Sequence, residues 1–340
     1  MDTRDFDYYL PEELIAQEPL KDRSASRMMK LDKQTGEIKH ESFKNIVNYL
    51  DENCVLVLNN TRVLPARLYG IKEETDAHIE ILLLKRIDMY NWQILVKPAK
   101  RAKIGTVIRF SDRLSGTISK EEDEGIRYIK FDFDGVFEDI IYEIGSMPLP
   151  PYIHHKLDDK ERYQTVYSKI NGSSAAPTAG LHFTDEILGQ IKNKGIEIEY
   201  VTLHVGLGTF RPVKVDKIEQ HHMHSEYYNI DEDVAKRLNE ARKNGKKIVA
   251  VGTTTVRTLE SASNKDGELT GLSDNTNIFI FPPYKFKFVD SIITNFHLPM
   301  STLIMMISAF AGKDKLFHAY EEAVKNKYRF FSFGDCMFID

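Results

Sequence analysis

The fold can be worked out from residues 171–213, which read NGSSAAPTAGLHFTDEILGQIKNKGIEIEYVTLHVGLGTFRPV. After a loop of small residues, the pattern of residues 185–194 predicts a helix. Thr184 can cap this helix, acidic residues suit its positive end, and Gly195 can end it. Residues 196–204 then alternate between apolar and polar side chains, as a strand does. The stretch therefore predicts a loop, a helix, a strand and a second glycine-rich loop.

The Gly206-x-Gly208 pair after this strand could bind a dinucleotide or form an ordinary tight turn. The dinucleotide fingerprint needs a loop that opens a helix, whose N-terminus holds the pyrophosphate. Here Pro212 favours extended geometry, and residues 213–215 look like a strand. We therefore reject the dinucleotide site. A turn is the commoner role for a lone glycine pair, but His204 before it and Arg211 after it favour a functional loop.

Three more predicted strands also end in polar residues. The first is the apolar run 54–58, which suits a strand covered on both faces and leads into Asn59, Asn60 and Thr61. Open α/β sheets place their ligands at the carboxyl ends of such strands. An asparagine-rich turn explains these residues equally well.

The second is the strand predicted at 246–251, which turns at Gly252 into a helix reaching about residue 263. Free backbone N–H groups, three threonine hydroxyls at 253–255 and Arg257 would suit an anion or a carboxylate. A capped strand-to-helix turn is the alternative, and it explains one threonine but not three beside an arginine.

The third is predicted at 291–294 and is followed by Asn295 and His297. A lone histidine is more often a hydrogen-bonded core residue than a catalyst, but a third polar loop after a strand shifts that balance. From about residue 180 onward, strands alternate with helices, which predicts a layered α/β sheet that is largely parallel or mixed. The remaining predicted helices are 11–17, 161–169, 231–244, 303–310 and 314–325, and the remaining strands are 28–31, 38–40, 278–281 and 330–333.

Residues 62–146 have a different character. Six short runs, separated by polar or glycine-bearing turns, suggest a small closed or nearly closed β-barrel. The runs are 66–69, 77–84, 92–96, 107–110, 116–119 and 127–133. The stiff segment 148–151, PLPP, leads back into the larger domain. We therefore predict an α/β domain made of 1–61 and 147–340, with a β-barrel domain inserted at 62–146.

The composition excludes several classes of protein. The 42% hydrophobic and 29% charged residues are typical of a soluble globular chain. No signal peptide or run long enough to span a membrane is present, so we expect the cytoplasm. With Cys54 and Cys336 alone, neither a disulfide framework nor an iron–sulfur cluster can form. The net charge of −5 means that any nucleic-acid binding must depend on a local basic patch.

The histidine-rich segment 220–226, QHHMHSE, is a candidate metal site because zinc accepts histidine and glutamate ligands. Side chains along an extended segment alternate between two faces, so at most two of the histidines can point the same way. With no fourth ligand evident, we predict an ordinary polar loop and no metal. Glu226 remains available for acid–base chemistry.

The same motifs carry a resemblance to a known family. Residues 176–184, APTAGLHFT, and 203–213, LHVGLGTFRPV, are similar to the S-adenosylmethionine:tRNA ribosyltransferase-isomerases of queuosine biosynthesis. Further matches follow in order at 223–226, 251–254, 256–260, 294–299 and 329–332, and upstream at 59–67, 148–153 and 163–167. Nearly the whole chain is covered. Met300 departs from the pattern, which usually has a lysine at this position.

The resemblance implies the same two-domain plan and a defined reaction. The family transfers and isomerises the ribosyl group of S-adenosylmethionine onto 7-aminomethyl-7-deazaguanine at the tRNA wobble position. The products are epoxyqueuosine-tRNA, adenine and methionine. S-adenosylmethionine is thus a consumed substrate and no cofactor is expected; the cysteine count excludes its radical use. We expect a monomer that binds this tRNA and no membrane.

This chemistry needs a general base for the hydrogens beside the sulfonium, an acid for the departing adenine, and groups that hold the substrates. The proton-transfer candidates are His182, His204, Glu226 and His297. The S-adenosylmethionine-binding candidates are Thr178, Gly180, Phe183, Gly206, Gly208, Thr209, Phe210, Arg211, Thr253, Thr254, Arg257, Asn295 and Phe296, and the phenylalanines could equally belong to the core. The tRNA-binding candidates are Asn60, Arg62, Lys97, Lys100, Arg101, Lys103, Lys325, Lys327 and Arg329.

Two other functions are considered beside this one. An α/β enzyme acting on a free phosphosugar or nucleotide would turn over a small molecule without RNA. A non-catalytic RNA-binding module would bind tRNA without consuming S-adenosylmethionine.

Overall fold

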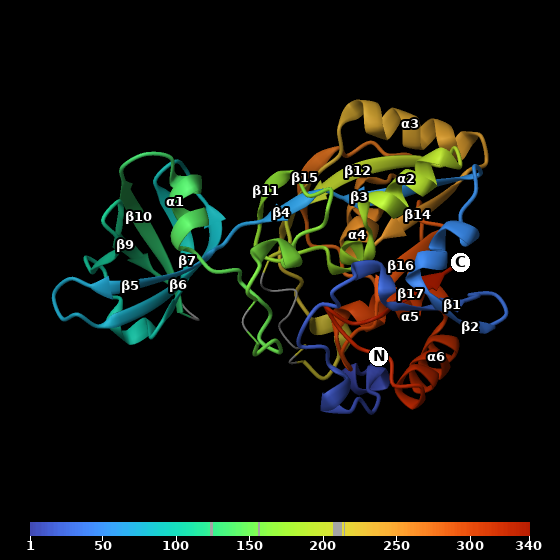
Figure 1. Cartoon of the computed structure of the whole chain (residues 1–340), viewed down its shortest axis with the longest axis horizontal. Coiled ribbons are helices and arrows are strands. Elements are labelled where there is room, and N and C mark those ends of the chain that lie inside the picture. Colours follow the sequence, from blue (N-terminus) through green and yellow to red (C-terminus); the bar gives the residue numbers. More distant parts are fainter. Residues whose placement is uncertain (123–124, 156, 207–212, 214) are drawn as a thin grey trace. The chain divides into compact units, whose positions relative to one another are not determined.

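The structure is a computed structural model of the 340-residue chain, and it describes residues 1–122, 125–155, 157–206, 213 and 215–340. The chain divides into two compact units, and Figure 1 labels the helices and strands of each. The α/β unit comprises Met1–Arg62, Pro151–Ile170 and Ala176–Asp340, and the barrel unit comprises Val63–Pro150 and Asn171–Ala175.

The α/β unit is built on a nine-stranded mixed sheet with the order β15-β13-β12-β3-β14-β16-β17-β1-β2. Neighbouring strands β12, β3, β14 and β16 are parallel, as are β17 and β1, and the other pairs are antiparallel. The strand bounds are β1 Arg27–Leu31, β2 Ile38–Ser42, β3 Cys54–Asn59, β12 Glu197–Leu203, β13 Glu226–Asn229, β14 Lys247–Val251, β15 Ser273–Thr276, β16 Ser291–Asn295 and β17 Cys336–Ile339.

Helices cover both faces of this sheet. On one face, the core cluster joins Leu56 and Leu58 of β3 to Ile187 and Ile191 of α2. The helices α3 and α4 contact β12 and β14 but contribute no described residue to this cluster. They cover the other face of the sheet, towards which the alternate residues of these strands point. The helix bounds are α2 Asp185–Asn193, α3 Glu232–Lys243, α4 Thr253–Ala262, α5 Thr302–Ala311 and α6 Lys313–Lys325, with the 3-10 helix η4 at Phe43–Tyr49.

The barrel unit is a closed barrel with the strand order β10-β7-β6-β5-β8-β9. Its interior is filled by alternate strand residues such as Ile81, Ile94 and Phe131, which are almost fully buried. The helix α1 (Phe137–Ile144) packs Phe137 against Trp92 and Phe131. The bounds are β5 Arg67–Lys72, β6 His78–Arg86, β7 Asn91–Lys97, β8 Val107–Ser111, β9 Leu114–Glu121 and β10 Ile126–Phe133; β4 (Thr61–Val63) and β11 (Ile170–Ser173) form a separate two-stranded sheet.

The predicted fold class, a layered mixed sheet with an inserted barrel, is confirmed. Local signals located the elements well where the caps were explicit: the Thr184 hydroxyl accepts a hydrogen bond from the backbone of Ile187, and Ser301 does the same for Ile304. Gly195 has a φ of 77°, as expected of a glycine that ends a helix.

Five predicted elements are wrong. At 161–169 the structure has only the 3-10 turn η7 (Lys160–Tyr163), and Val166 is exposed, so the apolar spacing was not a buried helical stripe. Residues 278–281 lie outside the strand, because the backbone of Ile278 donates to the Thr276 side chain where β15 ends. Residues 330–333 do not form a strand, because Phe331 has a φ of 73°, which extended backbone does not allow. The last strand of the chain is β17 instead. Val213 and Val215 are not in a strand, and 11–17 contains only the 3-10 turn η2 (Glu12–Leu14).

Candidate active site

Four parallel strands bring their polar ends to one edge of the sheet. His204 follows β12, Thr61 follows β3, Thr253 follows β14, and His297 follows β16. Because β12, β3, β14 and β16 are adjacent and parallel, their carboxyl ends lie at the same edge. This is the edge at which open α/β sheets bind ligands.

A pocket opens at this edge of the sheet. We call it the strand-end pocket. Its walls include backbone and side chains from the ends of β14 and β16 and from the loop 176–179. The lining residues are Tyr152, Ala176, Pro177, Thr178, Ala179, Val205, Gly252, Thr253, Thr254, Thr294, Asn295, Phe296, His297, Leu303, Phe331 and Ser332.

His297 is the candidate histidine that lines the strand-end pocket. Its Nε2 lies 2.9 Å from the Thr294 hydroxyl, and its backbone N–H donates to the Tyr320 hydroxyl at 2.9 Å. The Nδ1 atom makes no hydrogen bond with any described residue. Burial lowers the pKa of His297 to about 3, so its imidazole is neutral at pH 7. A neutral ring with one nitrogen uncommitted can accept or donate a proton towards a ligand.

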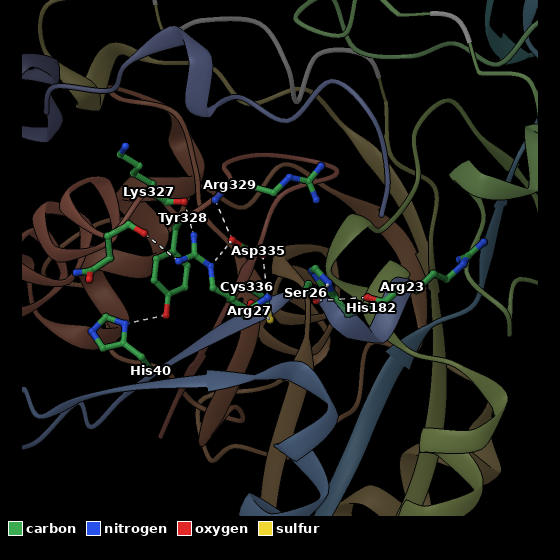
Figure 2. Close-up of polar contacts among 11 residues, drawn as sticks. Arg23, Ser26, Arg27, His40, His182, Lys327, Tyr328, Arg329, Asp335 and Cys336 are labelled. Atoms are coloured by element: carbon green, nitrogen blue, oxygen red, sulfur yellow. Dashed lines mark hydrogen bonds and ion pairs between the residues drawn. The ribbon is translucent and has the colours of Figure 1, made fainter. Parts of the chain in front are cut away.

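His182 is buried between two side chains that use both of its ring nitrogens. Asn295 donates through its amide to the carbonyl of Phe331 (2.8 Å), so its oxygen faces His182 Nε2 at 3.1 Å. Nε2 must therefore carry the proton, and Nδ1 accepts from the Ser26 hydroxyl at 2.8 Å (Figure 2). Burial lowers the pKa of His182 to about 4. In this arrangement His182 holds Asn295 in place and has no nitrogen left for proton transfer.

His204 is half-buried beside the strand-end pocket but does not line it. Its Nδ1 lies 2.8 Å from the Thr61 hydroxyl, and its ring stacks on Tyr227 with 6.0 Å between centroids. Burial lowers its pKa. Nε2 makes no hydrogen bond with a described residue, so His204 keeps one nitrogen for a substrate.

Glu226 and Arg257 form a buried ion pair. Their side chains are 2% and 3% exposed, and Arg257 Nη1 contacts Glu226 Oε2. The other carboxylate oxygen accepts the backbone N–H of Gly206 at 2.7 Å. Glu226 thus links the helix α4 to the start of the loop that follows β12. Because both of its oxygens hold other groups in place, this carboxylate suits a positioning role.

The start of α4 presents uncommitted polar atoms. The Thr254 hydroxyl is buried, lines the strand-end pocket and has no partner among the described residues. Arg257 Nε and Nη2 are likewise buried without a described partner. By contrast, the Thr255 hydroxyl donates to the Val251 carbonyl at 2.7 Å and is satisfied within its own helix. Two of the three threonines, Thr253 and Thr254, therefore face the pocket.

Three predicted ligand-binding residues serve packing instead. Phe183 is fully buried with its ring against Phe43, and Phe296 is fully buried among Tyr320, Tyr328 and Phe330. Phe183 is absent from the lining of the strand-end pocket, whereas the buried Phe296 contributes to it. A Cβ at Gly180 would lie 2.0 Å from the Tyr167 hydroxyl, so this glycine is required by close packing. The predicted Gly208, Thr209, Phe210 and Arg211 lie outside the described residues.

The predicted tRNA-binding residues have different surroundings. Asn60 accepts from the Thr202 hydroxyl, Arg62 pairs with Glu161, and Lys325 pairs with Glu322. Lys327 is exposed, and Arg329 donates to the Glu18 carbonyl. In the barrel unit, Lys97, Lys100, Arg101 and Lys103 are all exposed, and none forms an ion pair with a described residue.

Sequence reasoning missed several residues of the pocket wall, among them a pair of side chains with hydroxyl groups. Tyr152 and Ser332 line the strand-end pocket, and their hydroxyls are hydrogen-bonded to each other. Both lie within motifs that carry the resemblance, which was the available signal. A hydroxyl pair from segments 180 residues apart has no local pattern that would mark it in advance.

Within the part of the chain that the structure describes, no group of three or more histidine, cysteine, aspartate or glutamate residues could hold a metal ion. None of the described helices is long and apolar enough to cross a membrane.

Comparisons with known proteins agree with one another. Residues 3–339 match the family described as "Queuosine biosynthesis protein". The chain is 60% identical over its whole length to the S-adenosylmethionine:tRNA ribosyltransferase-isomerase of Clostridioides difficile (strain 630), and it covers all of that protein. It is also similar to the crystal structure of S-adenosylmethionine tRNA ribosyltransferase from Thermotoga maritima, with a TM-score of 0.57 and 40% identity over 99% of this chain and 100% of that one. The chain is therefore an enzyme that belongs to the S-adenosylmethionine:tRNA ribosyltransferase-isomerase family of queuosine biosynthesis.

Proposed function

We propose that the protein transfers and isomerises the ribosyl moiety of S-adenosylmethionine onto 7-aminomethyl-7-deazaguanine at the tRNA wobble position. The amine nitrogen gains a bond to the ribosyl group and loses a proton. Methionine leaves as a neutral thioether with the electron pair of the C5′–S bond, and adenine leaves with the pair of its glycosidic bond and takes up a proton. The sugar is rearranged to the epoxide within the transferred group, so no external oxidant, reductant or cofactor is required.

The observation that carries the proposal is the unfilled hydrogen-bonding capacity of the strand-end pocket. Buried polar groups are nearly always hydrogen-bonded, and a buried hydroxyl without a partner calls for an explanation. The Thr254 hydroxyl and the uncommitted nitrogen of His297 both belong to this pocket. A ribose with its hydroxyls, or the ammonium and carboxylate of methionine, would supply the missing partners.

Within this pocket we assign Thr178, Thr253, Thr254 and Asn295 to substrate binding. Arg257, Gly206, Gly208, Thr209 and Arg211 belong to the same proposal through the family resemblance. Arg257 has two buried nitrogens without a described partner, so it retains donors for a carboxylate. His182 does not line this pocket, but its Nε2 hydrogen bond holds the side chain of Asn295 in place.

Two proton transfers are required, one from C5′ beside the sulfonium and one to the departing adenine. His297 is the first candidate because it is neutral and lines the pocket. His204 is the second candidate, since its Nε2 is uncommitted and it precedes the glycine-rich loop. Glu226, already committed to Arg257 and Gly206, fits an orienting role.

The second substrate, tRNA, would meet exposed cations. Lys97, Lys100, Arg101 and Lys103 of the barrel unit surround Pro98 and leave their charges without an ion pair among the described residues. Phosphate contacts from such cations provide most of the non-specific affinity for nucleic acids. The reacting base must also be displaced from the anticodon stack to reach a pocket.

The test is to incubate the protein with S-adenosylmethionine and tRNA carrying 7-aminomethyl-7-deazaguanine, and to measure adenine release. We expect adenine and methionine in equal amounts, and only when the modified tRNA is present. tRNA with unmodified guanine at the wobble position is the matched control. Turnover without RNA would favour the small-molecule enzyme, and tRNA binding with no adenine release would favour the RNA-binding module.

A further inference from the structure

A second pocket in the α/β unit is lined by cationic and hydroxyl side chains. It has about 310 Å³ of empty space, and its polar lining consists of Arg23, Arg162, Ser26, His182 and Ser332. No carboxylate is among the described residues that line it. We call it the arginine pocket. The cationic segment 21–27 supplies part of this wall.

Neither arginine of this pocket is neutralised by an ion pair with a described residue. Arg23 donates to the carbonyls of Gln164 (2.5 Å) and Glu161 (2.7 Å). Arg162 donates to the carbonyls of Leu20 and Lys21. Carbonyl groups fix the orientation of a guanidinium but leave its full charge. The nearby Arg27 is different, because it pairs with Asp335 at 3.3 Å and stacks on Tyr328 (Figure 2).

The two guanidinium groups line the same pocket. Burial and the charge of Arg162 lower the pKa of Arg23, whereas Asp159, Glu161 and Asp185, which lie outside the pocket lining, partly oppose this lowering. Two like charges held together by backbone contacts are a costly arrangement unless an anion lies between them. The Ser26 and Ser332 hydroxyls beside them can add neutral hydrogen bonds to such an anion.

The arginine pocket and the strand-end pocket share a wall. Ser332 lines both pockets. Asn295 lines the strand-end pocket, His182 lines the arginine pocket, and the two are hydrogen-bonded at 3.1 Å. An anion in the arginine pocket would therefore lie next to the proposed reaction site, separated from it by the hydrogen-bonded side chains of His182 and Asn295.

We propose that the arginine pocket binds a backbone phosphodiester of the tRNA next to the reacting nucleotide. The inference rests on the proposed function and adds a contact that places the base. Arg23 and Arg162 are half-buried, so a strand passing over the protein can reach them from solvent. A nucleotide whose base enters the strand-end pocket carries its phosphates past the neighbouring wall, where paired guanidinium groups bind phosphate oxygens in a fixed geometry.

The first experiment replaces both arginines, Arg23→Gln with Arg162→Gln, and measures adenine release while each substrate is varied. We expect the KM for modified tRNA to rise about tenfold or more, because hydrogen bonds to charged groups are strong. The KM for S-adenosylmethionine should stay within about twofold of wild type. Lys21→Gln is the matched control: it removes an exposed cation of the same segment that does not line the pocket, and it should leave both constants unchanged.

A rise in the KM for S-adenosylmethionine alone would overturn the proposal, because the pocket would then bind the methionine carboxylate. Unchanged constants for both substrates would also overturn it. Failure of the proposed function is a different result, since the wild-type protein would then release no adenine.

The second experiment needs no protein variant, so it stands even if the double variant fails to fold. Anticodon stem-loops carrying 7-aminomethyl-7-deazaguanine are made with one methylphosphonate linkage at each position around the modified nucleotide. We expect neutralisation of one linkage to weaken binding to the wild-type protein about tenfold, and neutralisation of the others to matter less. If the double variant folds, the same linkage should no longer weaken its binding more than the others do. No sensitive linkage within the loop would overturn the proposal.

Discussion

The polar residues of the strand-end pocket and the cations of the barrel unit follow opposite physical rules. Asn295 and His297 of the strand-end pocket, and His182 hydrogen-bonded to Asn295, are buried, uncharged and fixed by hydrogen bonds. In the barrel unit, Lys97 and Lys103 are exposed, charged and without an ion pair among the described residues.

The difference teaches what each region can contribute. A reaction at a sulfonium needs groups held in one geometry in a low-dielectric site, where each hydrogen bond counts for more. Attraction of a polyanion needs charge that remains available in solvent and acts at a distance. Substitutions at the strand ends should therefore alter the rate or the stability, whereas substitutions on the barrel should alter affinity and its salt dependence.

The largest effect is expected from breaking the buried ion pair with Arg257→Leu. An unpaired Glu226 carboxylate would remain in the interior, at a cost of about 3–5 kcal/mol in the free energy of unfolding. Urea denaturation at pH 7 measures this loss of stability, and the double variant Glu226→Gln/Arg257→Leu should recover part of it. The matched control is Arg113→Leu, since Arg113 pairs with Glu143 and the two side chains are 48% and 65% exposed; there we expect about 1 kcal/mol or less. Equal losses at the two pairs would contradict the assignment.

The next largest effect concerns His297→Asn. If His297 transfers a proton as proposed, its loss should lower kcat for adenine release about 100-fold or more, and the KM values should change little because the pocket keeps its shape. His40→Asn is a suitable control: the His40 side chain is hydrogen-bonded to Tyr328 and lies outside the strand-end pocket. If His297→Asn retained the wild-type kcat, His204 would become the first candidate for the proton transfer.

Acidification should distinguish the buried histidines from exposed ones. Burial lowers the pKa values of His182 and His297 to about 4 and about 3, below the 6.5 of an unburied histidine. Between these values and pH 6.5 the unfolded chain binds protons that the folded one does not, so stability falls as the pH drops. At pH 5 each buried histidine should lower the free energy of unfolding by about 2 kcal/mol relative to pH 7. His182→Gln should reduce this slope, and His78→Gln, an exposed barrel residue, should leave it unchanged. Identical slopes in all three proteins would show that His182 is not held neutral.

The smallest effect is expected from the barrel cations. Replacement of Lys97, Lys100, Arg101 and Lys103 by glutamine should raise the KM for tRNA by about tenfold or less and leave kcat unchanged. The slope of log affinity against log salt should become shallower by about one for each phosphate that these cations no longer bind. Arg109→Gln/Lys130→Gln, two exposed cations elsewhere on the barrel, is the matched control. A reduced kcat at saturating tRNA would mean that the barrel also positions the reacting base.

Local sequence determined the elements and their polar ends. The buried run at 54–58, the Thr184 cap and the turn at Gly252 were predictable because propensity, capping and alternation act over a few residues. The repeated short strands likewise predicted a barrel. The family motifs supplied the site candidates.

Only the tertiary structure decided which candidates face the pocket. His182 and His297 have similar sequence surroundings, each in a loop beside a phenylalanine, yet one has both ring nitrogens occupied and the other keeps one uncommitted. The partners of His182 are Ser26 and Asn295, which are 156 and 113 residues away in the chain. Phe183 and Phe296 became core for the same reason. Hydrogen bonding and burial of this kind depend on what packs across the sheet, and no pattern local to either histidine contains that information.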